Sequence, residues 1–188
     1  ENMYQHQWNA NDIYFYNVWK YLFKVIVLSN QSLSIIDSHR NLLSDQQASA
    51  FSAEVRAIRA LFYYYAMDMF GRIPIVTSYN VNLKQVVQNE RSEVFRFIFN
   101  ELQAVAPLLA DEHSNIRGDY YGRVTRPVAN FLLAKLALNA EVYTIDNWTS
   151  GSRQDGKNIF FHVNGEKKNA WETCIWYCEQ LRQEGYEL

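Results

Sequence analysis

The sequence lacks the features that mark several large classes of protein. It has two cysteines among 188 residues, too few for a disulfide framework. Its longest apolar patch, residues 21–28, is broken by Lys24 and is much shorter than a membrane-spanning helix. Eighteen basic residues stand against twenty acidic ones, with no basic block, and this balance argues against a nucleic-acid partner.

Motifs for catalysis and for metal binding are also missing. The chain has no HExxH, GxSxG, GxGxxG or Walker pattern, and its histidines lie apart in expected loops or termini: His6, His39, His113 and His162. Glu54 and Asp68 could be considered an acid/base pair, but their positions on one helix place them about 21 Å apart, too far for glycoside hydrolysis. We therefore expect no enzyme activity, no cofactor and no metal site.

The two cysteines, Cys174 and Cys178, are four residues apart in an expected helix and so share one face. That spacing does not suit a disulfide within one helix, and no second cysteine or histidine pair completes a zinc site. We expect both thiols to be buried beside Trp171 and Leu181.

Apolar residues at steps of three and four predict five helices, at residues 12–37, 44–70, 92–109, 125–142 and 169–185. Ser44 with Gln47 has the pattern of a capping box at the start of the second helix, and Asn169 has a similar partner at the start of the fifth. Ser92 and Thr125 are suited to cap the third and fourth helices. Short connections between the paired helices favour antiparallel hairpins.

The second helix contains the most informative stretch of the chain, FSAEVRAIRALFYYYAMDMFGRIP at residues 51–74. Gly71 can adopt the left-handed conformation that closes a helix, and Pro74 prevents a restart, so the helix ends near Phe70. One apolar stripe is expected to face the core: Phe51, Val55, Ile58, Leu61, Phe62, Tyr65, Ala66 and Met69.

Arg56 and Arg59 lie one turn apart on the same helix. Guanidinium groups bind carboxylates and stack on rings, so the pair could contact a ligand or partner protein. Arginines that are buried or half-buried are usually paired with an acid, and a structural ion pair to a neighbouring helix is the favoured interpretation.

Residues 159–163 followed by Asn164-Gly165 resemble one strand and the turn of a small β-hairpin near 159–168. The remaining pattern indicates an all-α fold of stacked antiparallel helical hairpins, similar to tetratricopeptide repeats but with long loops. The fifth helix has no partner, so we expect residues 1–188 to form a single incomplete helical domain.

Several motifs, taken in order, resemble the SusD/RagB family of surface nutrient-binding lipoproteins from Bacteroidetes. They span nearly the whole chain: Trp19-Lys20-Tyr21, Arg59-Ala60-Leu61, Tyr63-Tyr64, Phe70-Gly71-Arg72-Ile73-Pro74, Glu101-Leu102, Gly122-Arg123-Val124-Thr125, residues 134–143, residues 171–178 and Gly185-Tyr186-Glu187-Leu188. Arg72 departs from the family, which usually has an acidic residue after Phe-Gly, and Arg126-Pro127 replaces the usual lysine or asparagine. Members are also much longer, so the likeness covers their N-terminal to middle portion.

The resemblance implies a non-catalytic protein of the outer membrane, held at the cell surface by a lipidated cysteine upstream of this chain. Such a protein captures glycans or oligosaccharides and delivers them to a SusC-like TonB-dependent transporter. Two alternatives stay open: a RagB-like protein of the same kind of system that binds peptides, and an intracellular tetratricopeptide-like scaffold that binds protein tails.

Candidate ligand-binding residues come from the high aromatic content, 15% of the chain. Trp8, Asn11, Asp12 and Tyr14 offer rings together with amide and carboxylate groups, the chemistry that sugar recognition needs. The resemblance implies that binding residues of this type lie partly on loops near the first helix, and that much of the family's ligand site comes from a later, C-terminal region, which we expect to be absent from residues 1–188. Further candidates of the same kind are Tyr120, Tyr121, Trp148 and the pair Phe160-Phe161.

Overall fold

The computed structural model describes residues 4–9, 11–147, 149–150 and 152–186; the candidate Trp148 lies outside them. Within this part of the chain there are six α-helices and one two-stranded antiparallel sheet: α1 (Ile13–Ser38), α2 (Asp45–Phe70), α3 (Arg91–Val105), α4 (Arg126–Leu138), α5 (Ala140–Tyr143), β1 (Phe160–Val163), β2 (Glu166–Asn169) and α6 (Ala170–Gln183). Single 3₁₀ turns lie at Arg40–Leu42, Leu83–Gln85, Ala106–Leu108 and Gly156–Asn158.

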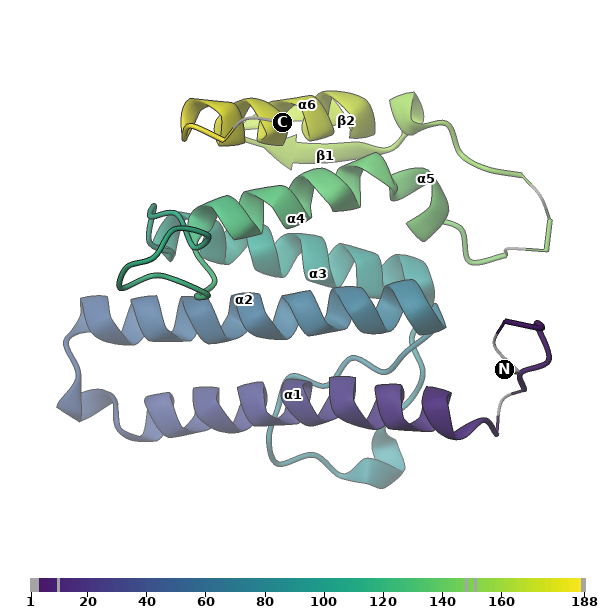
Figure 1. The fold of residues 1–188 in the computed structure, drawn as a ribbon, viewed down its shortest axis with the longest axis horizontal. Coiled ribbons are helices and arrows are strands. Elements are labelled where there is room, and N and C mark those ends of the chain that lie inside the picture. The colour runs from purple at the N-terminus through teal and green to yellow at the C-terminus, as the bar shows by residue number, and fades with distance from the viewer. Residues whose placement is uncertain (1–3, 10, 148, 151, 187–188) are drawn as a thin grey trace.

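The helices stack as antiparallel neighbours, which confirms the predicted all-α fold of helical hairpins (Figure 1). α1 packs along α2, α2 packs on α3, and α4 packs on α6. α3 lies behind α2 and α4 in this view, and the β-hairpin packs beside α6. None of the helices in the described part combines the length and apolar character needed to cross a lipid bilayer.

Short-range signals placed most helix ends correctly. Ser44 and Gln47 form a complete capping box, in which each side chain accepts a hydrogen bond from the other residue's backbone N–H. Gly71 follows α2 with φ of +71°, a conformation that favours glycine. The prediction for Ser92 was wrong: Glu90 precedes the first turn of α3, and the Ser92 hydroxyl instead donates to Asp146.

The β-hairpin predicted near residues 159–168 is confirmed. β1 and β2 pair antiparallel, with Val163 opposite Glu166 next to the turn and Phe160 opposite Asn169 at the far end. Asn164 and Gly165 form the connecting turn with φ of +53° and +77°, as the tight turn of a right-twisted hairpin requires.

The helix predicted over 125–142 is interrupted at Asn139, which divides it into α4 and α5. The Asn139 side chain donates a hydrogen bond to the Lys135 carbonyl, competing with the backbone ladder there. After α5 the chain continues through a loop to the 3₁₀ turn Gly156–Asn158, which comes before β1.

The prediction of which face of α2 is buried was wrong. Phe51, Tyr65 and Met69 are exposed, and the rest of that stripe is mostly half-buried. The buried face carries small residues together with a few large ones: Ala48, Ala53, Ala57, Arg59, Ala60, Tyr63, Tyr64, Ala66 and Met67. α2 has two apolar faces, and the alanine-rich one is inside because small side chains let α1 and α3 approach closely.

The two thiols are also more accessible than expected. Cys178 is exposed and Cys174 is half-buried. Trp171 and Ile175 are exposed on α6 as well, whereas Thr173 and Tyr177 face the core. The periodicity of α6 is therefore correct, but the cysteine face is turned outwards.

Candidate functional site

The N-terminal candidates lie where α1 begins. Trp8 and Tyr14 are exposed, and the Trp8 ring centroid lies 5.1 Å from that of His6. Asp12 has a structural task, because its carboxylate accepts a hydrogen bond from the Tyr14 backbone N–H at 3.1 Å and caps α1. Asn11 is exposed and is held through its backbone N–H, which donates to the Asn9 side chain. This segment thus presents exposed rings and an exposed amide.

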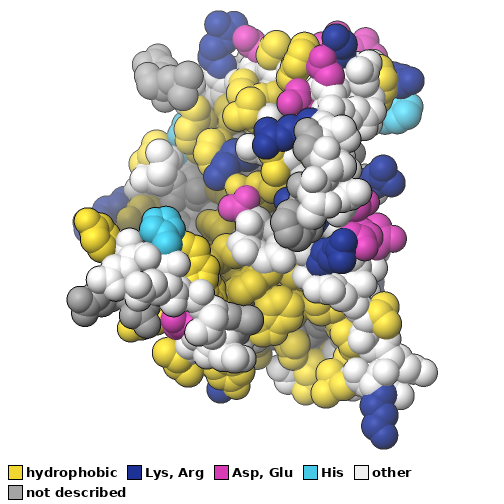
Figure 2. Space-filling model, turned by 90° about the vertical axis from the view of Figure 1, so that its right-hand side faces the viewer, with side chains coloured by type: hydrophobic (Ala, Val, Ile, Leu, Met, Phe, Trp, Pro, Cys, Tyr) yellow, Lys and Arg dark blue, Asp and Glu magenta, His cyan; other side chains and the backbone are white. Residues whose placement is uncertain are grey.

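Hydrophobic side chains gather at the same end of the molecule. Figure 2 looks onto the end of the molecule where α1 begins and α2 ends. Hydrophobic side chains occupy the middle of this view, and most charged side chains lie above them or at the edge. Trp19 of α1 contributes here, since its ring lies 4.3 Å from Phe23 and 5.1 Å, edge on, from Phe70. The first turns of α1 therefore rest on an aromatic cluster.

Tyr120 and Tyr121 lie at the opposite end, in the loop before α4 (Figure 1). The Arg123 guanidinium lies 4.9 Å from the Tyr120 ring centroid and also binds Glu54 of α2 through two hydrogen bonds of 3.0 and 2.6 Å. Tyr121 is exposed. The structure therefore does not bring the two groups of predicted ligand residues together into one site.

Arg56 and Arg59 form the ion pairs that were favoured from the sequence. Both guanidinium groups bind Glu101 of α3: Arg56 donates at 2.6 and 3.1 Å, and Arg59 donates at 2.7 Å. The Arg59 side chain is only 6% exposed and that of Glu101 15%. Burial raises the pKa of Glu101, but the hydrogen bonds and charges of the two arginines outweigh it and leave this pKa below its usual value.

The same buried cluster anchors the long loop between α2 and α3. Asn30 of α1 accepts a hydrogen bond from Arg59 and donates one to the Val76 carbonyl. The Tyr63 hydroxyl donates to the Val76 carbonyl at 2.9 Å and accepts from the Val76 N–H at 2.7 Å. These hydrogen bonds therefore hold the start of the loop, at Val76, against α1 and α2. Sequence reasoning missed this function of Asn30 and Glu101; the only signal for Glu101 was its place in the motif Glu101-Leu102 shared with the family.

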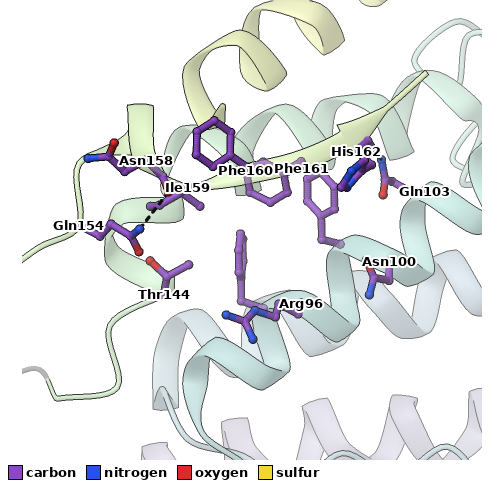
Figure 3. Close-up of a pocket in the computed structure, with 12 residues that line it drawn as sticks. Arg96, Asn100, Gln103, Thr144, Gln154, Asn158, Ile159, Phe160, Phe161 and His162 are labelled. Atoms are coloured by element: carbon purple, nitrogen blue, oxygen red, sulfur yellow. Dashed lines mark hydrogen bonds between the residues drawn. The ribbon is translucent and has the colours of Figure 1, made fainter. Parts of the chain in front are cut away.

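A further hollow, with a volume of about 420 Å³, lies between α3 and β1 (Figure 3). Phenylalanine rings from both elements form part of it, and Phe160, one of the sequence candidates, is half exposed there. Polar side chains surround the rings: Arg96, Asn100, Gln103, Thr144, Gln154, Asn158 and His162. Among the described residues no cluster of three or more histidine, cysteine or acidic side chains is arranged to hold a metal ion.

The described residues form stacked helical hairpins with exposed aromatic groups at both ends, and comparison with known proteins places this fold in a family. Residues 1–138 match the SusD-like family described as starch-binding and associating with the outer membrane. The starch-binding protein SusD of Bacteroides thetaiotaomicron is 36% identical over 158 residues, which cover 76% of this chain and 27% of that protein. The chain therefore belongs to the SusD-like family.

Solved structures agree on the fold. A SusD-like carbohydrate-binding protein from Bacteroides fragilis is similar with a TM-score of 0.71 at 16% identity, over 95% of this chain and 29% of that one. A SusD superfamily protein from Parabacteroides distasonis has a TM-score of 0.74 at 19% identity, over 98% and 34% of the two chains. The chain thus spans roughly a quarter to a third of the length of the relatives it matches.

Proposed function

We propose that this protein is a non-catalytic, cell-surface nutrient-binding protein that captures glycans or oligosaccharides. The observation that supports this most directly is the 36% identity over 158 residues with a protein named for starch binding. The name of the Bacteroides fragilis neighbour, a carbohydrate-binding protein, points the same way.

The N-terminal segment is the proposed contact of this chain with the ligand. Trp8 and Tyr14 offer exposed rings whose faces suit the apolar faces of sugars, and each ring also carries a polar group that can hydrogen-bond to a sugar hydroxyl. The Asn11 amide can both donate and accept hydrogen bonds to hydroxyl groups. Asp12 contributes by capping α1 and thereby fixing the position of Tyr14. The Tyr120-Tyr121 loop, at the other end, would contact a different part of a long ligand or a partner protein.

Delivery to a SusC-like TonB-dependent transporter and anchorage in the outer membrane by an upstream lipidated cysteine belong to the same proposal. The family description, which includes association with the outer membrane, supports the location, and the resemblance to the SusD/RagB family motivates the transporter partner. Co-purification from the native membrane tests the partner: a β-barrel transporter should accompany the protein through two affinity steps, and its absence would contradict this part of the proposal.

Calorimetric titration of the full-length protein tests capture itself, with a panel of maltoheptaose, laminarihexaose, a xyloglucan oligosaccharide and unstructured peptides. We expect saturable binding of an oligosaccharide and at least a tenfold loss of affinity in Trp8→Ala, since a desolvated tryptophan is often among the strongest contacts of a binding site. Trp171→Ala is the matched control, because that ring is 48% exposed, close to the 44% of Trp8, but lies on α6.

Binding of peptides alone would favour the RagB-like alternative. Binding of no panel member, or equal losses in Trp8→Ala and Trp171→Ala, would contradict the proposed capture of sugars at the N-terminal segment.

A further inference from the structure

The hollow between α3 and β1 has the composition of a ligand site, and it lies on other elements than the N-terminal segment. Phe95 and Phe99 of α3 and Phe161 of β1 are buried and close around it, with Phe99 and Phe161 4.4 Å apart between ring centroids. The half-exposed Phe160 ring points to the other face of β1, away from α3 (Figure 3). A hollow with an aromatic floor offers apolar contact to one face of a sugar.

Several polar groups around the hollow already have protein partners. The Gln103 amide donates to the His162 carbonyl at 2.9 Å and to the Tyr177 hydroxyl at 3.2 Å. The Gln154 amide donates to the Asn158 carbonyl, and the Thr144 hydroxyl donates to the Ala140 carbonyl. These bonds fix the side chains and leave their remaining oxygen lone pairs as acceptors.

Arg96 and Asn100 differ from this group. They lie four residues apart on α3, hence on one face of the helix, and both are exposed. Neither side chain makes a hydrogen bond or ion pair with any residue that the structure describes. The guanidinium fork and the amide are therefore available for a ligand.

The charge of the lining is one-sided. It includes Arg96 but no aspartate or glutamate. Acidic residues next to the lining along the chain have other partners. Glu101 pairs with Arg56 and Arg59, and Asp146 accepts from Ser92. Asp155 pairs with Lys157, and Glu141 accepts from the Gly156 N–H. A ligand with a carboxylate would meet donors and no like charge.

We propose that this hollow is a second carbohydrate subsite, specific for acidic oligosaccharides that contain uronic acids. Arg96 binds the sugar carboxylate through its guanidinium fork, Asn100 binds a neighbouring hydroxyl, and the aromatic floor of the hollow lies against the apolar face of the sugar. The inference rests on the proposed capture of carbohydrate and extends it to a ligand class and a place.

The test uses trigalacturonate and trimannuronate, each paired with its fully methyl-esterified form, in titrations of the full-length protein at fixed salt concentration. The free acid should bind about 10- to 100-fold more tightly than the ester, as loss of a charge-assisted hydrogen bond implies. Arg96→Gln should remove that preference, and Asn100→Ala should weaken the binding of both forms. Arg117→Gln, which removes an exposed arginine of the loop before α4, should change nothing.

Other results would overturn the subsite. If both acids bind no better than their esters, or if Arg96→Gln keeps the preference, the inference is wrong. If Trp8→Ala loses the preference for the free acid over the ester while Arg96→Gln keeps it, the acid is recognised at the N-terminal segment and not in the hollow. If neutral oligosaccharides bind and depend on Trp8 while the acids do not bind, the subsite alone fails; if no sugar binds at all, the proposed function fails with it. Unchanged circular dichroism spectra confirm that the variants are folded.

Discussion

Replacing Glu101 with glutamine should destabilise the fold far more than an ordinary charge removal. Glu101 is the only acid that the two arginines of α2 bind among the described residues, and it joins α3 to α2 through three hydrogen bonds. Glutamine has nearly the same shape but no charge. Arg59, at 6% exposure, would then keep a buried positive charge with only neutral partners, Asn30 and the Thr77 carbonyl.

Removing one member of a buried ion pair costs about 3–5 kcal/mol, mostly because the other charge is left buried without compensation. Glutamine can still accept one hydrogen bond, so the lower end applies and we expect a loss of about 3 kcal/mol in the free energy of unfolding. The matched control is Glu54→Gln. Glu54 also binds an arginine of another segment with two hydrogen bonds, but Arg123 is 43% exposed, so this pair should contribute less than about 1 kcal/mol.

Urea unfolding followed by far-UV circular dichroism measures both variants under the same conditions. The two midpoints should differ clearly, with the slope of the transition unchanged. If Glu101→Gln loses no more stability than Glu54→Gln, the buried cluster does not hold α2, α3 and the loop together in the way described.

Four further predictions follow from individual residues. Because the folded pKa of Glu101 is lowered, its stabilising effect is present above the usual carboxyl pKa and is lost as the pH falls through the lowered value. The stability gap between wild type and Glu101→Gln should therefore shrink in urea titrations as the pH is lowered below the usual carboxyl pKa. Tyr63→Phe should cost about 1–3 kcal/mol and speed amide exchange in residues 75–89, since the hydroxyl holds Val76 twice. Gly71→Ala should cost about 1–3 kcal/mol from its positive φ alone, because no atom lies within 4 Å of an added Cβ, and thermal melting measures this loss. Ile98→Ala should lower the free energy of unfolding by about 2–5 kcal/mol in the urea assay, because Ile98 is fully buried.

Helix ends and the hairpin turn could largely be predicted from the sequence, because the residues that determine each of them lie within a few positions of one another. The capping box at Ser44, the glycine after α2 and the Asn164-Gly165 turn each act within a few residues. The failures at Ser92 and Asn139 have local causes too, but there the side chain had a partner that competed with the expected one.

Burial could not be predicted as well, because periodicity does not distinguish two apolar faces of one helix. On α2 some large residues, such as Phe51 and Met69, lie outside, while alanines such as Ala57 and Ala60 are buried on the side that packs against α1 and α3. The same ambiguity placed Cys178 inside when it is exposed. Which face is buried depends on the partner helices, and a single helix sequence does not contain that information.

Only part of the candidate site could be derived from the sequence. The aromatic residues near Trp8 could be recognised by type, and their assignment as ligand residues stays a prediction. The separation of Trp8 from Tyr120, and the hollow between α3 and β1, both depend on contacts between distant segments. Gln103 and His162, for example, meet across 59 residues of chain. Such pairs follow from the packed fold and not from any spacing.

The most direct measurement of the central claim is hydrogen–deuterium exchange of the full-length protein, free and saturated with the tightest-binding oligosaccharide of the panel. Carbohydrate capture through the N-terminal segment predicts slower exchange at residues 4–16, with α2 and the Tyr120-Tyr121 loop unchanged for a short ligand. The claim would be contradicted if no oligosaccharide saturates the protein, or if saturation leaves residues 4–16 exchanging as in the free protein.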